Sequence, residues 1–365
     1  MKHFILAFTI AVLKSCIYFV YFAFFFDGIY TLTDDWKYLS TAIRFWENAP
    51  LGIVGLKELI EQVKIITNSS HPFYPIVNIF AVRLFGMVYS APVAINYIIL
   101  PVIACIGANF AARELLFDNT QKRLIYILLL FYPFLNSWAT ILNLKDIWVL
   151  ILFMGLLIGY IHFFHRRYVQ AFLLIIPISL VFGILRYYVP YLFFAAFILT
   201  LMLHKKTRKM AVLLSTAGIV GLLLFFPSFT NNILLFVNEA QTIRSFPIGF
   251  LRFSVTPIPF NTTLHYSFLN IPSIIHWLLF PFMLAGITQF WKTGKMPLRF
   301  LVIVVFVFTC FYASFSLLQG PRHRIQLSYN ILLFQFVSFY PFISKIIAGK
   351  HIVLMKRSND HYSAT

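Results

Sequence analysis

Two adjacent carboxylates, Asp34 and Asp35, follow the first long apolar run of the sequence. Only 11 Asp and Glu residues occur in the 365-residue chain, so a neighbouring pair is unusual. Such a pair can act as a general base, because one carboxylate raises the pKa of the other, or it can bind a divalent cation through oxygen. Thr33 or Asp34 can also cap a helix that begins near Trp36. These interpretations do not exclude each other.

Three further charged residues interrupt apolar sequence. Lys145 and Asp146 separate two apolar runs, and Arg186 separates two others. The Lys–Asp pair can simply mark a turn, and Arg186 can anchor a membrane interface beside two tyrosines. If Asp146 faces the same cavity as Asp35, the two carboxylates form a general-base or metal arrangement. Arg186 is also a candidate anion ligand, since a guanidinium fork matches phosphate oxygens.

A basic turn, Gly320-Pro321-Arg322-His323-Arg324, lies near the end of the chain. Glycine followed by proline favours a tight turn. The helix that follows would present its N-terminus, which attracts anions. The segment therefore predicts a phosphate or pyrophosphate site made by the two arginines and the histidine between them.

Other histidine and cysteine residues give weaker signals. His71 precedes a proline and is a candidate substrate contact or metal ligand, although a lone histidine in such a place is more often neither. Cys16, Cys105 and Cys310 lie in apolar segments without a CxxC motif, so neither a disulfide nor a metal site follows. The sequence contains no P-loop, GxGxxG, HExxH or GxSxG motif, so ATP-driven transport and nucleotide-sugar chemistry lack support.

The composition predicts the elements that must position these residues. Hydrophobic residues make up 61% of the chain and charged residues 11%, against about 25% charged in soluble domains. Many apolar runs reach the ~20 residues that cross a bilayer as a helix. We therefore expect an all-α polytopic membrane protein. The net charge of +18 is assigned to cytoplasmic loops, and nucleic-acid binding is not expected.

The apolar runs predict about ten transmembrane helices in a single integral membrane domain, residues 1–349, followed by a polar cytoplasmic tail, 350–365. Lys14 interrupts the first span and is expected to reach the cytoplasmic interface or to mark the true start of the span. The spans are expected at 5–27, 91–112, 124–142, 147–164, 169–185, 187–203, 210–229, 273–291, 300–318 and 326–345.

Basic clusters between spans orient the chain, because such clusters stay in the cytoplasm. Both termini are then cytoplasmic, and the long connections 28–90 and 230–272 face outward. The first outer loop is expected to carry amphipathic helices at 34–48 and 56–66 and a juxtamembrane helix at 72–88. This orientation places all the charged candidates above on the outer side.

Three motifs in this order resemble the GT-C superfamily of membrane glycosyltransferases, and a late basic turn looks like the one found near the end of several bacterial members. The motifs are the Asp-x-x-Tyr-x-x-x-Ala pattern after the first span, a proline-bearing segment later in the same loop, and an acid at the outer end of a later span. Here they are Asp35, Tyr38 and Ala42 preceded by Asp34, then His71-Pro72-Phe73-Tyr74-Pro75, and Asp146; the basic turn is Arg322-His323-Arg324. The chain departs from the family in having Asp-Asp where Asp-Glu is frequent, and Pro-Phe where Pro-Pro is frequent.

The resemblance implies transfer of a sugar from a polyprenyl-phosphate donor to a lipid- or glycan-linked acceptor hydroxyl, with inversion, outside the plasma (inner) membrane. Asp35 would be the general base, and Asp146 would orient the acceptor. The phosphate charge would be met by basic side chains, and other substrate contacts would come from nearby residues: Lys145, Arg186, Arg322, Arg324, and then Tyr38, His71 and His323. No cofactor is assigned, and a divalent metal (Mg²⁺ or Mn²⁺) bound by Asp34, Asp35 and Asp146 is left open.

Two other functions remain open. An oligosaccharide-unit polymerase or ligase of surface polysaccharides would use arginines in large outer loops, and Arg244 and Arg252 in 230–272 keep this alternative, with Glu239 nearby. A lipid-linked oligosaccharide flippase would need ionisable residues through the middle of the membrane. In this sequence the charges gather at the ends of spans, which favours the enzyme.

Overall fold

The computed structural model describes residues 2–48, 55–67, 71–225 and 245–348, and every regular element in these ranges is a helix. The all-α fold class is thereby confirmed. Glu239, Arg244 and the tail 350–365 lie outside the described residues. Six helical segments of the described chain are long and apolar enough to cross a membrane: Ala7–Phe24, Ser90–Glu114, Asp146–Phe164, Leu264–Lys292, Met296–Ala313 and Pro321–Ser344.

The other four expected spans are not among these six helices, so the count of ten is not confirmed. The expected span 210–229 corresponds to α11 (Arg208–Phe225), and its last four residues lie outside the described ranges. α9 (Tyr168–Gly183) and α10 (Tyr188–Leu203) are apolar helices of 16 residues each, or about 24 Å, against ~30 Å of bilayer hydrocarbon. The expected span 124–142 is divided into α6 (Asn119–Phe131) and α7 (Pro133–Ala139). Pro133 cannot donate to the α6 ladder and disfavours helical backbone at the preceding residue, so the break is a local consequence of sequence.

Lys14 has neither of the two expected roles. It lies within α1 (Lys2–Phe24), its side chain is buried, and its Nζ donates to the carbonyl oxygen of Leu130 at 2.5 Å. That carbonyl belongs to the last turn of α6, where the break leaves carbonyl groups without helical partners. The lysine therefore satisfies the broken end of α6 inside the bundle.

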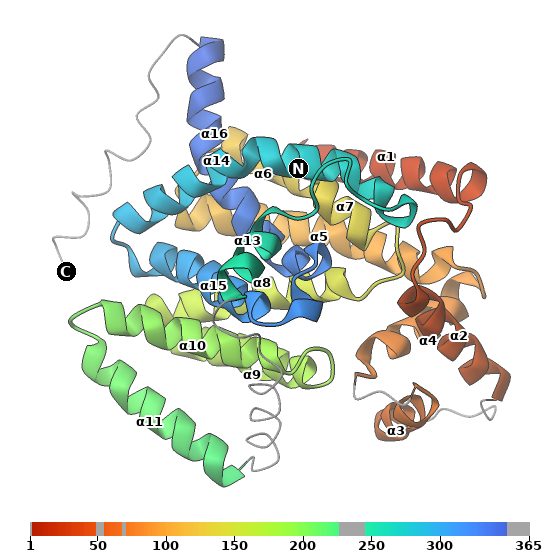
Figure 1. The fold of residues 1–365 in the computed structure, drawn as a ribbon, viewed down its shortest axis with the longest axis horizontal. Helices are drawn as coiled ribbons and strands as arrows, with labels where there is room; N and C mark the ends of the chain where they lie inside the picture. Colours follow the sequence, from red (N-terminus) through yellow and green to blue (C-terminus); the bar gives the residue numbers. More distant parts are fainter. Residues whose placement is uncertain (1, 49–54, 68–70, 226–244, 349–365) are drawn as a thin grey trace.

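The first long loop contains three helices close to the predicted positions: α2 (Thr33–Asn48), α3 (Leu56–Thr67) and α4 (Phe73–Phe85). They form a group beside the main bundle, at the lower right of Figure 1. α4 ends at Gly86, whose φ of 94° is a backbone conformation that favours glycine. The three helices share a small apolar core: Leu39, Ala42, Phe45, Leu59, Val63, Ile79 and Val82.

The main core is built around α8 (Asp146–Phe164), more than half of whose residues are buried. α8 contacts α5 (Ser90–Glu114), α9, α10 and the 3₁₀ helix η3 (Pro321–Leu327). η3 continues into α16 (Ser328–Ala348), which packs along α14 (Asn270–Lys292); α15 (Met296–Ala313) lies against α10. The helix α13 (Phe246–Val255) was not predicted, and it ends just before the prolines of 256–259.

Candidate active site where α2, α8 and η3 meet

Arg322 joins two of the predicted carboxylates. Its Nε donates to Oδ2 of Asp146 at 2.8 Å, and its Nη1 donates to Oδ2 of Asp34 at 3.0 Å. Asp34 lies in the first turn of α2, and Asp146 is the first residue of α8. The structure thus brings together the acidic pair, the later acid and the basic turn, which are far apart in the sequence.

Asp146 is held by a second guanidinium on its other side. Arg186 lies in the turn between α9 and α10, and its Nη2 donates to Oδ1 of Asp146 at 2.5 Å. The Asp146 side chain is 1% exposed and the Arg186 side chain 6% exposed, so the pair is removed from solvent. A buried carboxylate is tolerated when its oxygens are matched by charged donors. These ion pairs fix η3 and the α9–α10 turn against the first turn of α8.

Asp35, rather than Thr33 or Asp34, makes the capping bond at the start of α2. The helix begins at Thr33, and Oδ2 of Asp35 accepts from the backbone N–H of Leu32 at 3.0 Å. This is the contact that the third helical residue makes in a capping box. The prediction that Thr33 or Asp34 is the cap was wrong, because Asp34 faces outward to the arginine of η3.

The carboxylate of Asp35 is fully buried, yet only one of its oxygens is used. Oδ2 also accepts from the hydroxyl of Tyr89 at 2.9 Å, whereas Oδ1 has no hydrogen-bond partner. Burial raises the pKa of Asp35 to about 7, and the charge of Asp34 acts in the same direction. The bonds from Leu32 and Tyr89 and the charge of Arg322 oppose this rise. Asp35 therefore titrates near neutral pH.

A buried amide network, which the sequence did not predict, supports Asp35. Nδ2 of Asn143 donates to the backbone oxygen of Asp35 at 3.0 Å and to Oδ1 of Asn78 at 2.8 Å. Oδ1 of Asn143 accepts from the hydroxyl of Tyr74 at 2.8 Å, and its backbone N–H donates to Tyr89. Asparagines inside apolar runs are costly in a membrane, and this cost was the signal that could have marked them.

Lys145 and His71 lie next to the ion network, which is the set of ion pairs that Asp34, Asp146, Arg186 and Arg322 form. Within the described ranges, Lys145 has no side-chain hydrogen bond or ion pair. Burial is the main cause that lowers its pKa to about 8; the charge of Arg186 adds to this effect, and the charge of Asp146 opposes it. Burial, followed by the charges of Lys145 and Arg186, lowers the pKa of His71 to about 4, so the imidazole is neutral at pH 7. The His71 ring stacks on Tyr187 with centroids 6.2 Å apart.

Tyr38 and His323 are placed at the edge of the same group. The Tyr38 ring meets Tyr74 edge-on at a centroid distance of 5.1 Å, and burial raises the pKa of Tyr38 to about 12. The charge of Arg322 lowers the pKa of the Tyr38 hydroxyl and the charge of Asp34 raises it, so the hydroxyl lies close to the ion network. The His323 ring stacks on Tyr312 with centroids 5.3 Å apart.

Arg324 does not join this group, although it was predicted to bind phosphate with Arg322. Its Nη1 donates to the carbonyl oxygens of Phe253 at 3.0 Å and Ser254 at 2.7 Å, and its Nη2 donates to that of Thr256 at 2.7 Å. These are carbonyl groups at the end of α13 that lack helical partners. The Arg324 donors are thus used to hold α13 against η3.

We expect Arg324→Lys to destabilise the protein by about 2 kcal/mol, because one ammonium cannot replace a planar fork that donates to three carbonyls. Thermal unfolding of the detergent-solubilised protein measures this loss. Arg252→Lys is the matched control, because Arg252 is exposed on α13 and makes one long side-chain hydrogen bond, to Oε1 of Gln319 at 3.3 Å; it should cost less than about 0.5 kcal/mol. Equal losses in the two variants would contradict the structural role of Arg324.

A metal-bound form of the site stays a prediction. Within the part of the chain that the structure describes, no group of three or more His, Cys, Asp or Glu side chains is arranged to hold a metal ion. Three of the four carboxylate oxygens of Asp34 and Asp146 accept from guanidinium groups. The positive charges that balance these carboxylates in the structure are therefore the arginines.

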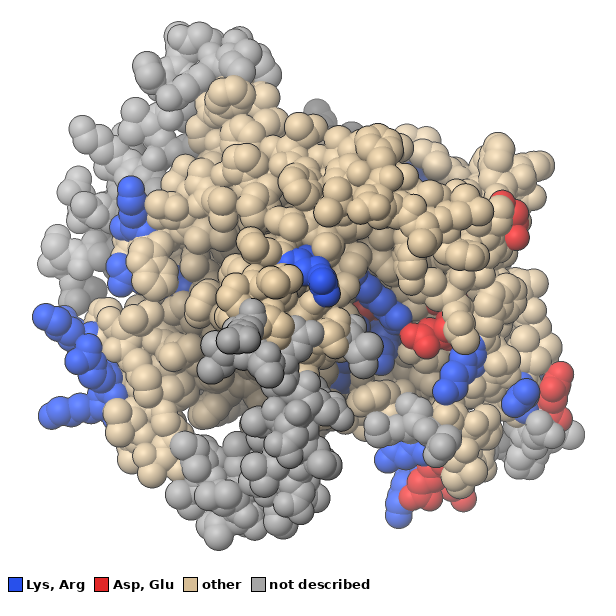
Figure 2. All heavy atoms as spheres, viewed as in Figure 1, with Lys and Arg blue, Asp and Glu red and all other residues tan. Residues whose placement is uncertain are grey.

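Figure 2 shows how charge is distributed on one face of the molecule. Among the charged side chains visible in this view, those at the left edge are Lys or Arg, and the Asp and Glu side chains lie in the right half.

Comparison of the chain with protein-family models, curated proteins and solved structures gave no match.

Proposed function

We propose that this protein is a membrane glycosyltransferase that moves a sugar from a polyprenyl-phosphate donor to an acceptor hydroxyl at the outer face of the plasma membrane. The observation that carries the proposal is the contact of Arg322 with Asp34 and Asp146 beside the buried Asp35. A carboxylate that titrates near neutral pH and adjacent guanidiniums supply a base for the acceptor and cations for a leaving phosphate.

In the proposed reaction, Asp35 takes the proton of the acceptor hydroxyl while the acceptor oxygen attacks the anomeric carbon of the donor sugar. The bond between that carbon and the phosphate oxygen breaks, and its electron pair leaves with the phosphate. Attack opposite to the leaving group inverts the anomeric centre. Oδ1 of Asp35 is the oxygen without a partner, so it is the atom assigned to the proton. Since Oδ1 is buried, the acceptor reaches it through a local opening.

The developing phosphate charge is assigned to Arg322, Arg186 and Lys145. Asp34 and Asp146 already balance the two guanidiniums, so the ammonium of Lys145 supplies positive charge beyond that balance. Nη2 of Arg322 is also not engaged by any described residue. Fixed cations aimed at a leaving group supply a large part of the rate enhancement in many enzymes.

We expect the transfer rate to follow a bell-shaped pH profile with limbs near pH 7 and pH 8. Asp35 acts deprotonated and its pKa is raised to about 7, so the active fraction increases as pH rises through 7. Lys145 acts protonated and its pKa is lowered to about 8, so the active fraction decreases above 8. Rates measured with a synthetic donor across about pH 5 to 10 test the profile. Lys145→Gln should remove the alkaline limb; a rate independent of pH contradicts both assignments.

Reconstitution tests the function itself. The purified full chain is placed in liposomes with a synthetic polyprenyl-phosphate sugar and a hydroxyl acceptor, and the glycosylated acceptor is quantified. Formation of a glycosidic bond that depends on the protein supports the proposal. Movement of the donor across the bilayer without any glycosidic bond identifies a transporter and refutes it.

A second candidate is an oligosaccharide-unit polymerase or ligase. It is favoured by Arg252, whose Nη1 donates to Oε1 of Gln319 at 3.3 Å, immediately before the turn that carries Arg322. An arginine from the 230–272 region therefore reaches the candidate site. Such an enzyme would be centred on arginines rather than on Asp35, and the two proposals predict different behaviour of an Asp35 variant.

A further inference from the structure

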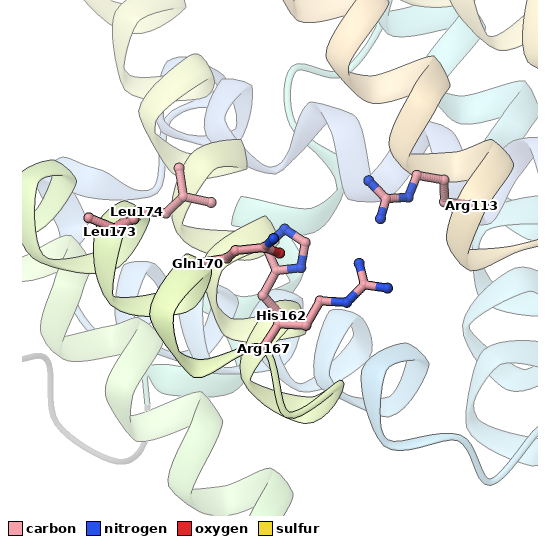
Figure 3. Close-up of a pocket in the computed structure, with 6 residues that line it drawn as sticks. All are labelled: Arg113, His162, Arg167, Gln170, Leu173 and Leu174. Carbon is pink, nitrogen blue, oxygen red and sulfur yellow. The ribbon is translucent and has the colours of Figure 1, made fainter.

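A cavity of about 430 Å³ lies at the opposite end of α8 from Asp146 (Figure 3). It opens where α5 and α8 end and α9 begins. α8 has 19 residues, which corresponds to about 28 Å and hence to roughly the thickness of bilayer hydrocarbon. The cavity is therefore separate from the candidate active site. Its lining residues are Arg113, His162, Arg167, Gln170, Leu173 and Leu174.

The two guanidinium groups that line the cavity have no ion pair with a carboxylate among the described residues. The guanidinium groups of Arg113 and Arg167 extend toward each other from two different helix ends (Figure 3), and neither makes an ion pair or side-chain hydrogen bond within the described ranges. The neighbouring Glu114 contacts Nε2 of His165 at 2.9 Å and makes no ion pair with either arginine, so two guanidiniums at this end of the helices face one carboxylate. Two like charges that share one cavity repel each other, and an anion between them removes that repulsion.

Neutral donors lie beside these arginines. Nδ1 of His162 is buried without a hydrogen-bond partner, and the amide of Gln170 lies next to the imidazole (Figure 3). A buried polar atom without a partner is costly unless a ligand or water satisfies it. Both groups can donate to phosphate oxygens, in addition to the guanidiniums.

The remaining wall of the cavity is aliphatic. Leu173 and Leu174 continue the lining along α9, and Leu173 is 69% exposed. α9 is an apolar helix, so a leucine exposed on it is suited to contact acyl chains. The site therefore combines a cationic end with an apolar side, which matches a ligand with an anionic head and a hydrocarbon tail.

We propose that this cavity binds the phosphate of an anionic phospholipid headgroup, with the acyl chains against Leu173 and Leu174. Two guanidiniums recognise phosphate by paired N–H···O bonds, which a single ammonium cannot reproduce. Basic pockets between transmembrane helices hold acidic headgroups by the same chemistry. The lipid would join the ends of α5 and α8 to the start of α9, and it is not required for the chemistry at Asp35.

Binding to the full-length detergent-solubilised protein tests the site with three probes: phosphatidylglycerol, phosphatidylcholine and inorganic phosphate. We expect phosphatidylglycerol to bind wild type and to raise its Tm, whereas phosphatidylcholine and phosphate leave the Tm unchanged. The Arg113→Gln/Arg167→Gln variant should bind phosphatidylglycerol about a hundredfold more weakly, about tenfold for each guanidinium removed. Lys205→Gln/Lys206→Gln removes equal charge from the exposed α10–α11 connection and should retain wild-type affinity.

A second variant keeps the test decisive if the double arginine variant does not fold. Gln170→Glu adds a carboxylate to the cavity at an exposed position, and we expect about tenfold weaker phosphatidylglycerol binding from charge repulsion. Unchanged binding in Gln170→Glu would refute the cavity as the phosphate site. An equal Tm increase with inorganic phosphate would refute the lipid and identify a free-anion site.

Discussion

Replacing Asp35 with asparagine is expected to lower the rate of sugar transfer by about 10² to 10⁴-fold, the usual contribution of a general base. Oδ1 of asparagine can still accept from the Leu32 N–H and the Tyr89 hydroxyl, so the start of α2 is preserved. The amide nitrogen then occupies the position of the oxygen that has no partner and cannot take a proton. The measurement is the initial rate in liposomes at pH 8, where wild-type Asp35 is mostly ionised.

Glu47→Gln is the matched control, because Glu47 lies at the exposed end of the same helix and outside the site. Its rate should equal that of wild type, and both variants should unfold at nearly the wild-type temperature. If Asp35→Asn keeps full activity, Asp35 serves only as the cap of α2. The arginine-centred polymerase or ligase then becomes the better explanation of the site.

Asp146→Asn is expected to lower the free energy of unfolding by about 3 to 5 kcal/mol, the typical effect of removing one partner from a buried ion pair. The asparagine oxygen can accept from one guanidinium, but its NH₂ group faces the other. Arg186 is then left buried without a full counter-charge. Among the described residues, the other side-chain acceptor for its guanidinium is Oε1 of Gln326 at 3.5 Å. Thermal or denaturant unfolding in detergent measures the change.

The Asp34→Asn variant is compared with Asp146→Asn, because Asp34 and Asp146 both pair with Arg322. The Asp34 side chain is 53% exposed, against 1% for Asp146, so solvent replaces most of the lost interaction. We expect a loss below about 1 kcal/mol. Similar losses in the two variants would show that the buried network does not hold α8 and η3 together.

The helices of the first loop illustrate what sequence can predict. The spacing of apolar residues placed α2, α3 and α4 close to their observed bounds, because amphipathic periodicity, proline and glycine act over a few neighbouring residues. The same local rules did not predict the number of helices long enough to cross a membrane. Pro133 divides one expected span, and α9 and α10 are shorter than a bilayer crossing of ideal length.

In the candidate site, too, some features follow from the sequence and others from the tertiary structure. The sequence by itself determined that this is an apolar helical protein whose rare carboxylates and outlying arginines gather at helix ends, because hydrocarbon penalises charge everywhere else. Only the tertiary structure decided the partner of each group. Asp34 and Asp35 differ by about 100° around α2, so one meets Arg322 and the other is buried beside Tyr89.

The two arginines of η3 separate for the same reason. Residues two apart in a 3₁₀ helix point about 120° away from each other, so Arg322 meets carboxylates while Arg324 meets the carbonyl end of α13. Nothing in the local sequence distinguishes the two residues, because their partners come from segments 68 or more residues away. The sequence determined which residues carry charge, and the packing of distant helices determined which of them form the site.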